Sequence, residues 1–169
     1  MSASIGTTRV SEVMVTNVIT VKTADKMEEV ARLFEQQDIN AAPVVDSSGR
    51  CLGIITNHDI AEYESTRVDL ENECRHGVSF DLARYGIGTI PRLPGRNFDD
   101  VGFHMTKHLV TAAADDGLSR VAESMCRQHI HHVIVLDEEK RVRGMLSALD
   151  ILGQILGVPV CRQAKCPVD

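Results

Sequence analysis

Apolar residues recur along the chain at a spacing that predicts amphipathic helices separated by short strands. In the first such helix the apolar positions stand at i, i+3, i+4 and i+7, the pattern of one helix face. They are Met27, Val30, Ala31 and Phe34. Asp25, with Glu28 three residues later, resembles a capping box, so we expect this helix to begin there.

Short β-branched and apolar runs surround this helix. Residues 18–21 predict a brief strand that ends at a turn. After the helix, residues 43–46 predict a second strand, residues 47–50 a turn and residues 52–56 a third strand. A further helix is expected to begin near residues 57–59. The order of elements is therefore β-α-β-β-α.

The same pattern returns 91 residues later. Residues 14–60 align with residues 105–151 without a gap, and 13 of the 47 aligned positions are identical. The second helix face repeats the spacing of the first, with Leu118, Val121, Ala122 and Met125. A gapless register across several elements indicates two copies of one structural unit. One unit of ~47 residues buries too little surface to be stable alone, so we expect the copies to share a core.

The repeats divide the chain into four parts. We predict a first repeat at 9–64, an inter-repeat insertion at 65–104, a second repeat at 105–157 and an irregular tail at 158–169. A polar run at the start of the insertion could extend the preceding helix or form a second one. Gly and Pro are frequent later in the insertion, so we expect residues 86–98 to be its most mobile segment.

Composition excludes several classes of protein. The chain has 169 residues, a net charge of −6, 43% hydrophobic residues and only 4% aromatic residues. An acidic, aromatic-poor chain lacks the basic surface and stacking residues of a nucleic-acid binder. No apolar run approaches the ~20 residues of a membrane span, and the first residues have no signal-peptide core, so we expect a cytoplasmic protein. Five scattered cysteines do not make a disulfide scaffold.

One motif occurs in both copies at the end of the third strand. It consists of a glycine, two apolar residues, Thr or Ser, two further residues and Asp. Its fixed positions are Gly53, Thr56 and Asp59 in the first copy and Gly144, Ser147 and Asp150 in the second. The motif resembles the signature of CBS domains, and the resemblance extends to Pro43–Asp46 and to the first-strand threonines Thr20 and Thr111. It covers nearly all of residues 9–157.

The resemblance implies a tandem CBS pair, often called a Bateman module. The implied fold class is α/β, with two β-α-β-β-α CBS repeats packed with pseudo-two-fold symmetry. Such pairs bind adenosine-containing ligands in two clefts between the repeats, and they usually regulate a partner and are not catalysts themselves. The resemblance also implies a homodimer that meets through the last helix of each repeat.

The residues of the motif suit such a ligand on chemical grounds. Thr56 ends a strand and Asp59 lies in the first turn of the next helix, where unpaired N–H groups and the helix dipole favour anions. The Asp59 carboxylate has two acceptor oxygens that match the vicinal hydroxyls of a ribose. An Asp in the first helical turn is also the usual capping residue, so the same carboxylate could only cap the helix.

The candidate ligand-binding residues follow from both copies of the motif. They are Thr20, Thr56, His58, Asp59, Thr111, His132, Ser147 and Asp150. His58 stands where the family often has a basic residue that meets phosphate, and Leu149 replaces it in the second copy. Thr56 and Ser147 could equally be helix N-caps.

Other clusters give weaker signals. Three histidines at 129, 131 and 132 leave a helix and enter a strand, where neighbouring side chains point to opposite faces, so we expect no metal site. Cys161 and Cys166 have no second pair with which to form a zinc site. No P-loop, nucleophile motif or HExxH is present, so no catalytic residue is predicted.

We therefore predict a regulatory or sensor module that binds AMP, ADP or ATP and signals by conformational change. S-adenosylmethionine is the alternative ligand, and a structural dimerisation protein with vestigial clefts is the alternative function. A homodimer is also expected from an apolar stripe on the last helix, at Ile151, Leu152, Ile155 and Leu156. The expected partners are a small adenosyl ligand and an unidentified regulated protein, with neither nucleic acid nor membrane.

Overall fold

The computed structural model describes residues 5–76 and 98–158. The first half contains η1 (Val10–Glu12), β1 (Val21–Lys22), α1 (Met27–Gln37), β2 (Ala41–Val45), β3 (Cys51–Thr56) and α2 (Asn57–His76). The second half contains α3 (Val101–His104), β4 (Thr111–Ala112), α4 (Leu118–Gln128), β5 (His132–Leu136), β6 (Val142–Ser147) and α5 (Ala148–Leu156).

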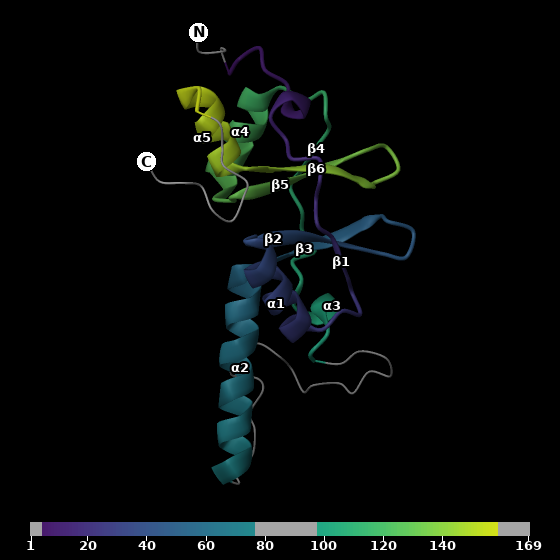
Figure 1. Cartoon of the computed structure of the whole chain (residues 1–169), viewed down its shortest axis with the longest axis vertical. Helices are drawn as coiled ribbons and strands as arrows, with labels where there is room; N and C mark the ends of the chain where they lie inside the picture. The colour runs from purple at the N-terminus through teal and green to yellow at the C-terminus, as the bar shows by residue number, and fades with distance from the viewer. Residues whose placement is uncertain (1–4, 77–97, 159–169) are drawn as a thin grey trace.

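The internal repeat is confirmed in three dimensions. Helices α1 and α4 begin and end 91 residues apart, as do β2 and β5, and β3 and β6. Each half forms a three-stranded sheet in which the first strand runs parallel to the second and the second antiparallel to the third. The two sheets lie next to each other in the middle of the molecule, with the helices on their outer sides (Figure 1). The predicted α/β class is therefore correct.

The symmetry of the pair is visible in isolated backbone bridges. Arg50 pairs with Arg141, its own equivalent 91 residues later, so the pseudo-two-fold axis passes close to this pair. Val15 pairs with Met145, and the equivalent residues Thr106 and Ile54 pair in the same antiparallel way.

Two local predictions were wrong. The first strand contains only Val21 and Lys22, because residues 18–20 make no ladder with β2. The expected capping box at Asp25 is absent: the Asp25 carboxylate accepts a hydrogen bond from the backbone N–H of Lys22 at 2.8 Å and closes the turn before α1. Helix α1 then begins at Met27, with Lys26 as an N-cap that makes no side-chain bond.

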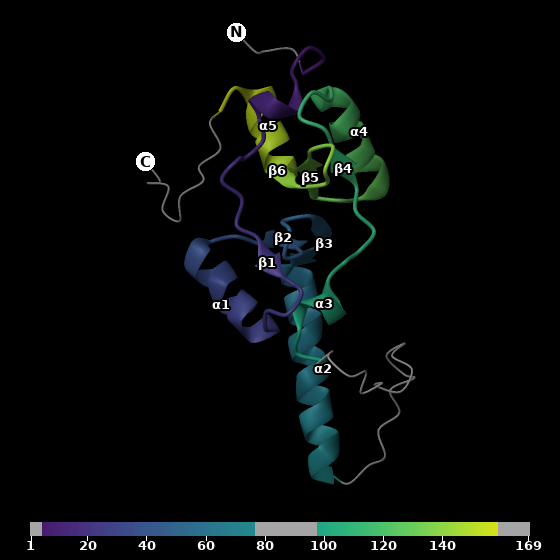
Figure 2. The same ribbon diagram turned by 90° about the vertical axis from the view of Figure 1, so that its right-hand side faces the viewer.

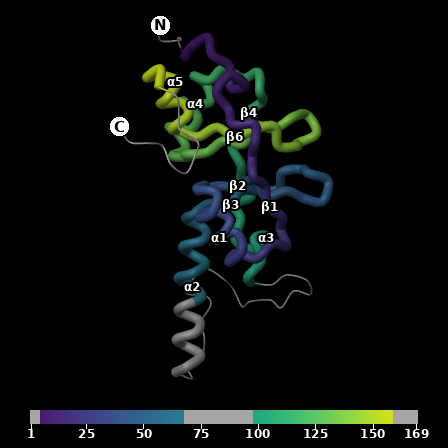
Figure 3. Tube along the Cα trace, viewed as in Figure 1, coloured from purple at the N-terminus to yellow at the C-terminus, as the bar shows by residue number. Residues whose placement is uncertain are grey.

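The two hydrophobic cores exchange their leading segments. Val10, on η1 at the start of the first repeat, is fully buried against Leu118 and Leu146 of the second repeat. Val101, from the segment ahead of the second repeat, is fully buried in the core of the first. Backbone bonds fix both crossings: Val10 N–H donates to the Asp116 carbonyl and Val101 N–H to the Asp25 carbonyl, each at 2.9 Å. The purple N-terminal trace in Figure 3 can be followed from the upper half past the sheets into β1.

Helix α2 is more than twice as long as α5, its equivalent in the second repeat. Its 20 residues show that the polar run after Asp59 extends the helix of the first repeat and does not form a second one. Tyr63 on α2 donates a hydrogen bond to Asp99 at 2.9 Å and contacts the rings of Phe98 and His104. These contacts join α2 to α3 and to the residues before it, and Figure 2 shows the two helices next to each other. The segment predicted to be mobile, 86–98, lies outside the described residues except for Phe98.

No helix in the described part of the chain is both long and apolar enough to cross a membrane.

Candidate functional site

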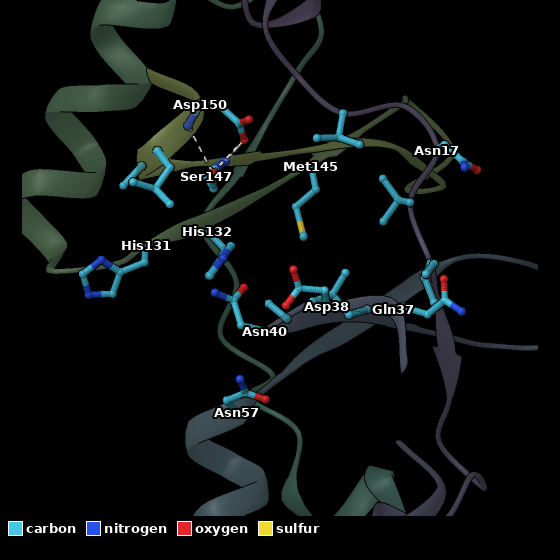
Figure 4. A pocket seen from close by; sticks show the side chains of 17 residues that line it. Asn17, Gln37, Asp38, Asn40, Asn57, His131, His132, Met145, Ser147 and Asp150 are labelled. Atoms are coloured by element: carbon cyan, nitrogen blue, oxygen red, sulfur yellow. Dashed lines mark hydrogen bonds between the residues drawn. The ribbon is translucent and has the colours of Figure 1, made fainter. Parts of the chain in front are cut away.

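A cavity of about 840 Å³ opens between the two repeats (Figure 4). One wall comes from residues 15–19 before β1, which we call the crossing segment because they run from the second repeat to the first. The other walls come from the end of α1 with the start of β2, from the start of β5, and from the junction of β6 with α5. The residues that line it are Val15, Asn17, Val18, Ile19, Gln37, Asp38, Ile39, Asn40, Ala41, Asn57, His131, His132, Met145, Ser147, Ala148, Leu149 and Asp150. We call this cavity the Asp150 cleft.

The β6–α5 junction forms one wall and holds the duplicated motif. Ser147 is the N-cap of α5, and its backbone N–H and Oγ both donate to the Asp150 carboxylate, at 2.8 and 2.7 Å. The Asp150 N–H in turn donates to Ser147 Oγ at 3.2 Å. Asp150 is only 5% exposed, so this reciprocal capping box fixes a buried carboxylate beside the cavity.

The crossing segment forms the opposite edge. Val15 and Met145 exchange two backbone hydrogen bonds, Val15 N–H to the Met145 carbonyl at 2.8 Å and Met145 N–H to the Val15 carbonyl at 2.9 Å. This pairing places Asn17 and Val18 of the first repeat in the same cavity as the Met145 thioether of the second. The cleft therefore depends on the packing of both repeats.

The end of α1 supplies the third wall. Asp38 is the C-cap of the helix and adopts a left-handed conformation with φ 52°. Asp and Asn tolerate this region better than other non-glycine residues. Figure 4 shows the Asp38 carboxylate turned toward the cavity, on the side away from Ser147 and Asp150. Asn40 follows at the start of β2, and its carbonyl accepts the N–H of Asn57 at 3.0 Å.

The two imidazoles of the cleft are at the start of β5. His131 is exposed, whereas His132 is half-buried. Burial lowers the pKa of the His132 imidazole below its ordinary value, the adjacent His131 lowers it further, and Asp150 opposes the decrease. The lowered pKa favours the uncharged form of the His132 ring. Among the described residues that line the cleft there are two aspartates and no lysine or arginine.

Three of the eight predicted ligand-binding residues line the Asp150 cleft. They are His132, Ser147 and Asp150. Thr56 and Asp59 form the equivalent capping box in the first repeat, where the Thr56 N–H and Oγ1 each donate to the Asp59 carboxylate at 2.7 Å. Thr20, His58 and Thr111 are exposed and lie outside the lining of this cleft. Contact of all eight residues with a ligand stays a prediction.

Sequence reasoning missed several polar residues of the cleft. Asn17, Asp38, Asn40 and Asn57 stand in loops or at the ends of elements, where no periodic pattern marks them. The repeat register held one usable signal. Asp38 aligns with His129, and both residues are helix C-caps with φ 52°, so the two copies place a carboxylate and an imidazole at one equivalent position.

The described residues hold no group of three or more His, Cys, Asp or Glu side chains placed to bind a metal ion. Cys51 is a free thiol, and burial raises its pKa. Cys161 and Cys166 lie outside the described residues.

Comparison with known families identifies the repeats. A model described as "CBS domain" matches residues 10–66 and again residues 99–157. The chain belongs to the CBS-domain family. The predicted tandem CBS pair is thereby confirmed.

The curated relatives of the chain are longer proteins. A homoserine O-acetyltransferase of Methanohalobium evestigatum is 26% identical over 144 residues, which cover 85% of this chain and 23% of that protein. A 5′-AMP-activated protein kinase subunit gamma of Dictyostelium discoideum is 25% identical over 142 residues, 82% of this chain and 22% of that protein. The chain thus spans about a quarter of the length of these curated relatives.

Solved structures of other CBS pairs have the same fold. The CBS domain pair of protein MJ0100, in complex with 5′-methylthioadenosine and S-adenosyl-L-methionine, superposes with a TM-score of 0.67 at 25% identity and covers 89% of this chain and 97% of that chain. CBSX2 in complex with AMP gives a TM-score of 0.67 at 14% identity, with 88% and 96% covered, and this likeness concerns the fold alone.

Proposed function

We propose that this CBS pair is a regulatory module that binds an adenosine-containing ligand in the Asp150 cleft. The observation that carries the proposal is a cavity of about 840 Å³ between the repeats, with a buried motif carboxylate in its wall. Support also comes from the CBS pair of protein MJ0100, whose solved complex contains two adenosyl compounds.

The cleft has a suitable surface for each part of adenosine. Val18, Ile39 and Met145 offer apolar surface to the faces of an adenine ring. Contact with these side chains would bury this flat, weakly polar group favourably. A carboxylate has about four acceptor sites, so Asp150 can cap α5 and accept hydrogen bonds from the ribose diol at the same time. The amides of Asn17 and Asn40 can donate to or accept from the ring edge.

A ligand in this cleft would contact both repeats at once. Val18 and Asn40 belong to the first repeat, and Met145 and Ser147 to the second. A ligand shifts a conformational equilibrium by its difference in affinity for the two states. Binding across the boundary between repeats therefore favours one relative orientation of the two sheets, and we propose that a regulated protein responds to it. The module itself would catalyse no reaction.

The test is calorimetry with adenosine, AMP, ADP, ATP and S-adenosylmethionine on the wild-type chain and on Asp150→Asn. Asn keeps the size of Asp but removes the charge, and a hydrogen bond to a charged group is worth about 1.5–3 kcal/mol, so we expect affinity to fall roughly 10- to 100-fold. Asp59→Asn is the matched control, because it disturbs the same type of capping box without touching the Asp150 cleft.

The proposal is supported if the compound that binds the wild type binds Asp150→Asn weakly and at least one binding event survives in Asp59→Asn. Thermal unfolding gives an independent check, because a ligand at 100 times its Kd stabilises the folded state by about 2.7 kcal/mol. An absence of binding by all five compounds would contradict the proposal and favour a structural module.

We also propose that two copies associate through α5. Among the described residues, seven large hydrophobic side chains are exposed, and five of them stand on or just after α5. They are Leu149, Leu152, Ile155, Leu156 and Val158. Ile151, which the sequence placed in this stripe, is instead buried in the core of the second repeat.

A second copy is the occupant that suits this surface. The equivalent positions on α2 are His58, Ala61, Glu64 and Ser65, so the corresponding face of the first repeat is polar. A two-fold interface must be complementary to itself, and an apolar helix stripe meets that condition when two α5 helices pack against each other.

A further inference from the structure

The electrostatic character of the Asp150 cleft differs from that of a phosphate site. Asp38 and Asp150 bring two carboxylates to its walls, and its described lining contains no lysine or arginine. His132 compensates little, because burial lowers its pKa and disfavours the charged ring. His131 is the remaining titratable group of the lining and is exposed.

The helix dipoles reinforce this character. Helix α1 points its C-terminal end at the cavity through Gln37 and Asp38, and that end of a helix carries a partial negative charge. Helix α5 points its N-terminal end at the cavity, and the Asp150 carboxylate lies at that end, where it accepts the N–H of the N-cap Ser147 and offsets the positive end of the dipole. The Ala148 N–H donates to the His131 carbonyl, and the Asp150 N–H donates to Ser147 Oγ. The nearest helix N-terminus is therefore already engaged by an anion of the chain itself.

The repeat register shows which residues make the difference. At the position of Asp38 the second repeat has His129, which suits the negative end of a helix. At the position of Leu149, beside Asp150, the first repeat has His58. Asp38 suits the left-handed backbone of the C-cap, but its negative charge faces the negative end of α1, so the charge of Asp38 is not explained by the stability of the helix.

We infer that the Asp150 cleft selects adenosyl compounds whose 5′ group is neutral or cationic, such as a thioether or a sulfonium, and that Asp38 is a specificity-determining residue that disfavours a 5′ phosphate. This inference rests on the proposed function, since it assumes that adenosine occupies the cleft. Like charges placed together across a binding site reduce affinity for the wrong ligand, and a carboxylate near a sulfonium raises affinity for the right one.

The test compares three compounds that share adenosine and differ at the 5′ position: methylthioadenosine, S-adenosylmethionine and AMP. Calorimetry gives the affinities, and the NMR signal of the Met145 methyl group reports binding in this cleft, because Met145 lines it. The signal is assigned by its loss in Met145→Leu. The variant is Asp38→Asn, since Asn also tolerates the left-handed backbone, and Glu64→Gln on α2 removes one exposed negative charge elsewhere.

We expect methylthioadenosine and S-adenosylmethionine to shift the Met145 signal at lower concentration than AMP. Asp38 is exposed, and exposed charge pairs contribute modestly to binding. Asp38→Asn should therefore lower the affinity for S-adenosylmethionine up to roughly fivefold and raise the affinity for AMP by a similar factor. Glu64→Gln should leave the preference unchanged.

Two results would overturn the inference. One is AMP binding at the Met145 signal as tightly as methylthioadenosine, and the other is an unchanged preference in Asp38→Asn. Both leave the proposed function standing, because adenosyl compounds still bind. If none of the three compounds binds, and adenosine itself does not bind either, the proposed function fails with the inference.

Discussion

Val15 crosses directly over Gly144. A Cβ atom added to Gly144 would stand 2.8 Å from the Val15 carbonyl oxygen and 2.6 Å from the sulfur of Met14. The same relationship recurs at Gly53, where an added Cβ would meet the Thr106 carbonyl oxygen at 2.8 Å. The motif glycine of each repeat therefore lets another segment of the chain pass over β3 or β6, and at Gly144 that segment forms an edge of the Asp150 cleft.

Gly144→Ala should therefore destabilise the fold. The added methyl group meets backbone, which cannot rotate away as a side chain can, and overpacking of this kind costs about 1–3 kcal/mol. The measurement is the free energy of unfolding in urea. Gly117→Ala is the control, because its Cβ would have nothing within 4 Å. Equal stability of the two variants would show that the crossing segment shifts freely.

Lys140→Gly should stabilise the chain. Lys140 has φ 61° in the β5–β6 turn, and its equivalent in the first repeat, Gly49, has φ 83°. A left-handed conformation costs an ordinary residue about 1–2 kcal/mol, and glycine avoids this cost. Glycine is also more flexible in the unfolded chain, which offsets part of the gain in stability. We expect a net gain of about 0.5–1 kcal/mol in urea unfolding. Gly49→Lys should lower stability, and a change of the opposite sign in either variant would contradict the argument.

The stability of the fold should depend on the titration of His132. Because burial holds the pKa of His132 in the folded chain below its ordinary 6.5, the unfolded chain binds this proton at a higher pH. The contribution of neutral His132 to the free energy of unfolding is therefore complete above pH 6.5. This contribution is lost as the pH falls from 6.5 through the pKa of His132 in the folded chain.

We expect the urea midpoint to decrease less between about pH 7.5 and 5.5 in His132→Gln than in the wild type. A proton NMR titration of the imidazoles measures the pKa directly. A folded-state pKa at or above 6.5 for His132 would contradict the prediction.

Association through α5 should be sensitive to charge. Leu152 is 48% exposed on α5, and a lysine there would place two like charges in the proposed two-fold interface. Light scattering at micromolar concentration should give the mass of a dimer for the wild type and of a monomer for Leu152→Lys. Ala61→Lys changes the equivalent exposed position of α2 and should leave the dimer intact. A monomeric wild type would refute the interface.

The elements that sequence predicted well are those with their own periodic pattern. Helices α1 and α4 carry complete apolar faces, and the register of 91 residues fixed the strands that follow them. The two-residue strand β1 has no period to detect, and Asp25 bonds to a turn that depends on the packing of its neighbours. The exchange of Val10 and Val101 between cores is a tertiary event that no local pattern contains.

The site was predictable to the extent that it belongs to the repeated motif. Ser147 and Asp150 follow from the motif, because a capping box is a local structure with fixed spacing. Asp38 does not, since its place in the cleft depends on how the end of α1 packs against the other repeat. The comparison of equivalent positions, Asp38 with His129, was the one sequence signal available for it.

The exchanged leading segments also bear on how the two halves are held together. Helix η1, which precedes β1, packs in the core of the second repeat, and α3, which precedes β4, packs in the core of the first. The two halves are therefore held together by this packing as well as by the chain between them. A chain cleaved between the repeats would yield two pieces that need each other to fold, and we expect them to copurify as a complex. The same dependence allows two intact chains to trade partners, with the first repeat of one completing the second repeat of the other, which gives the protein a route to a domain-swapped dimer at high concentration.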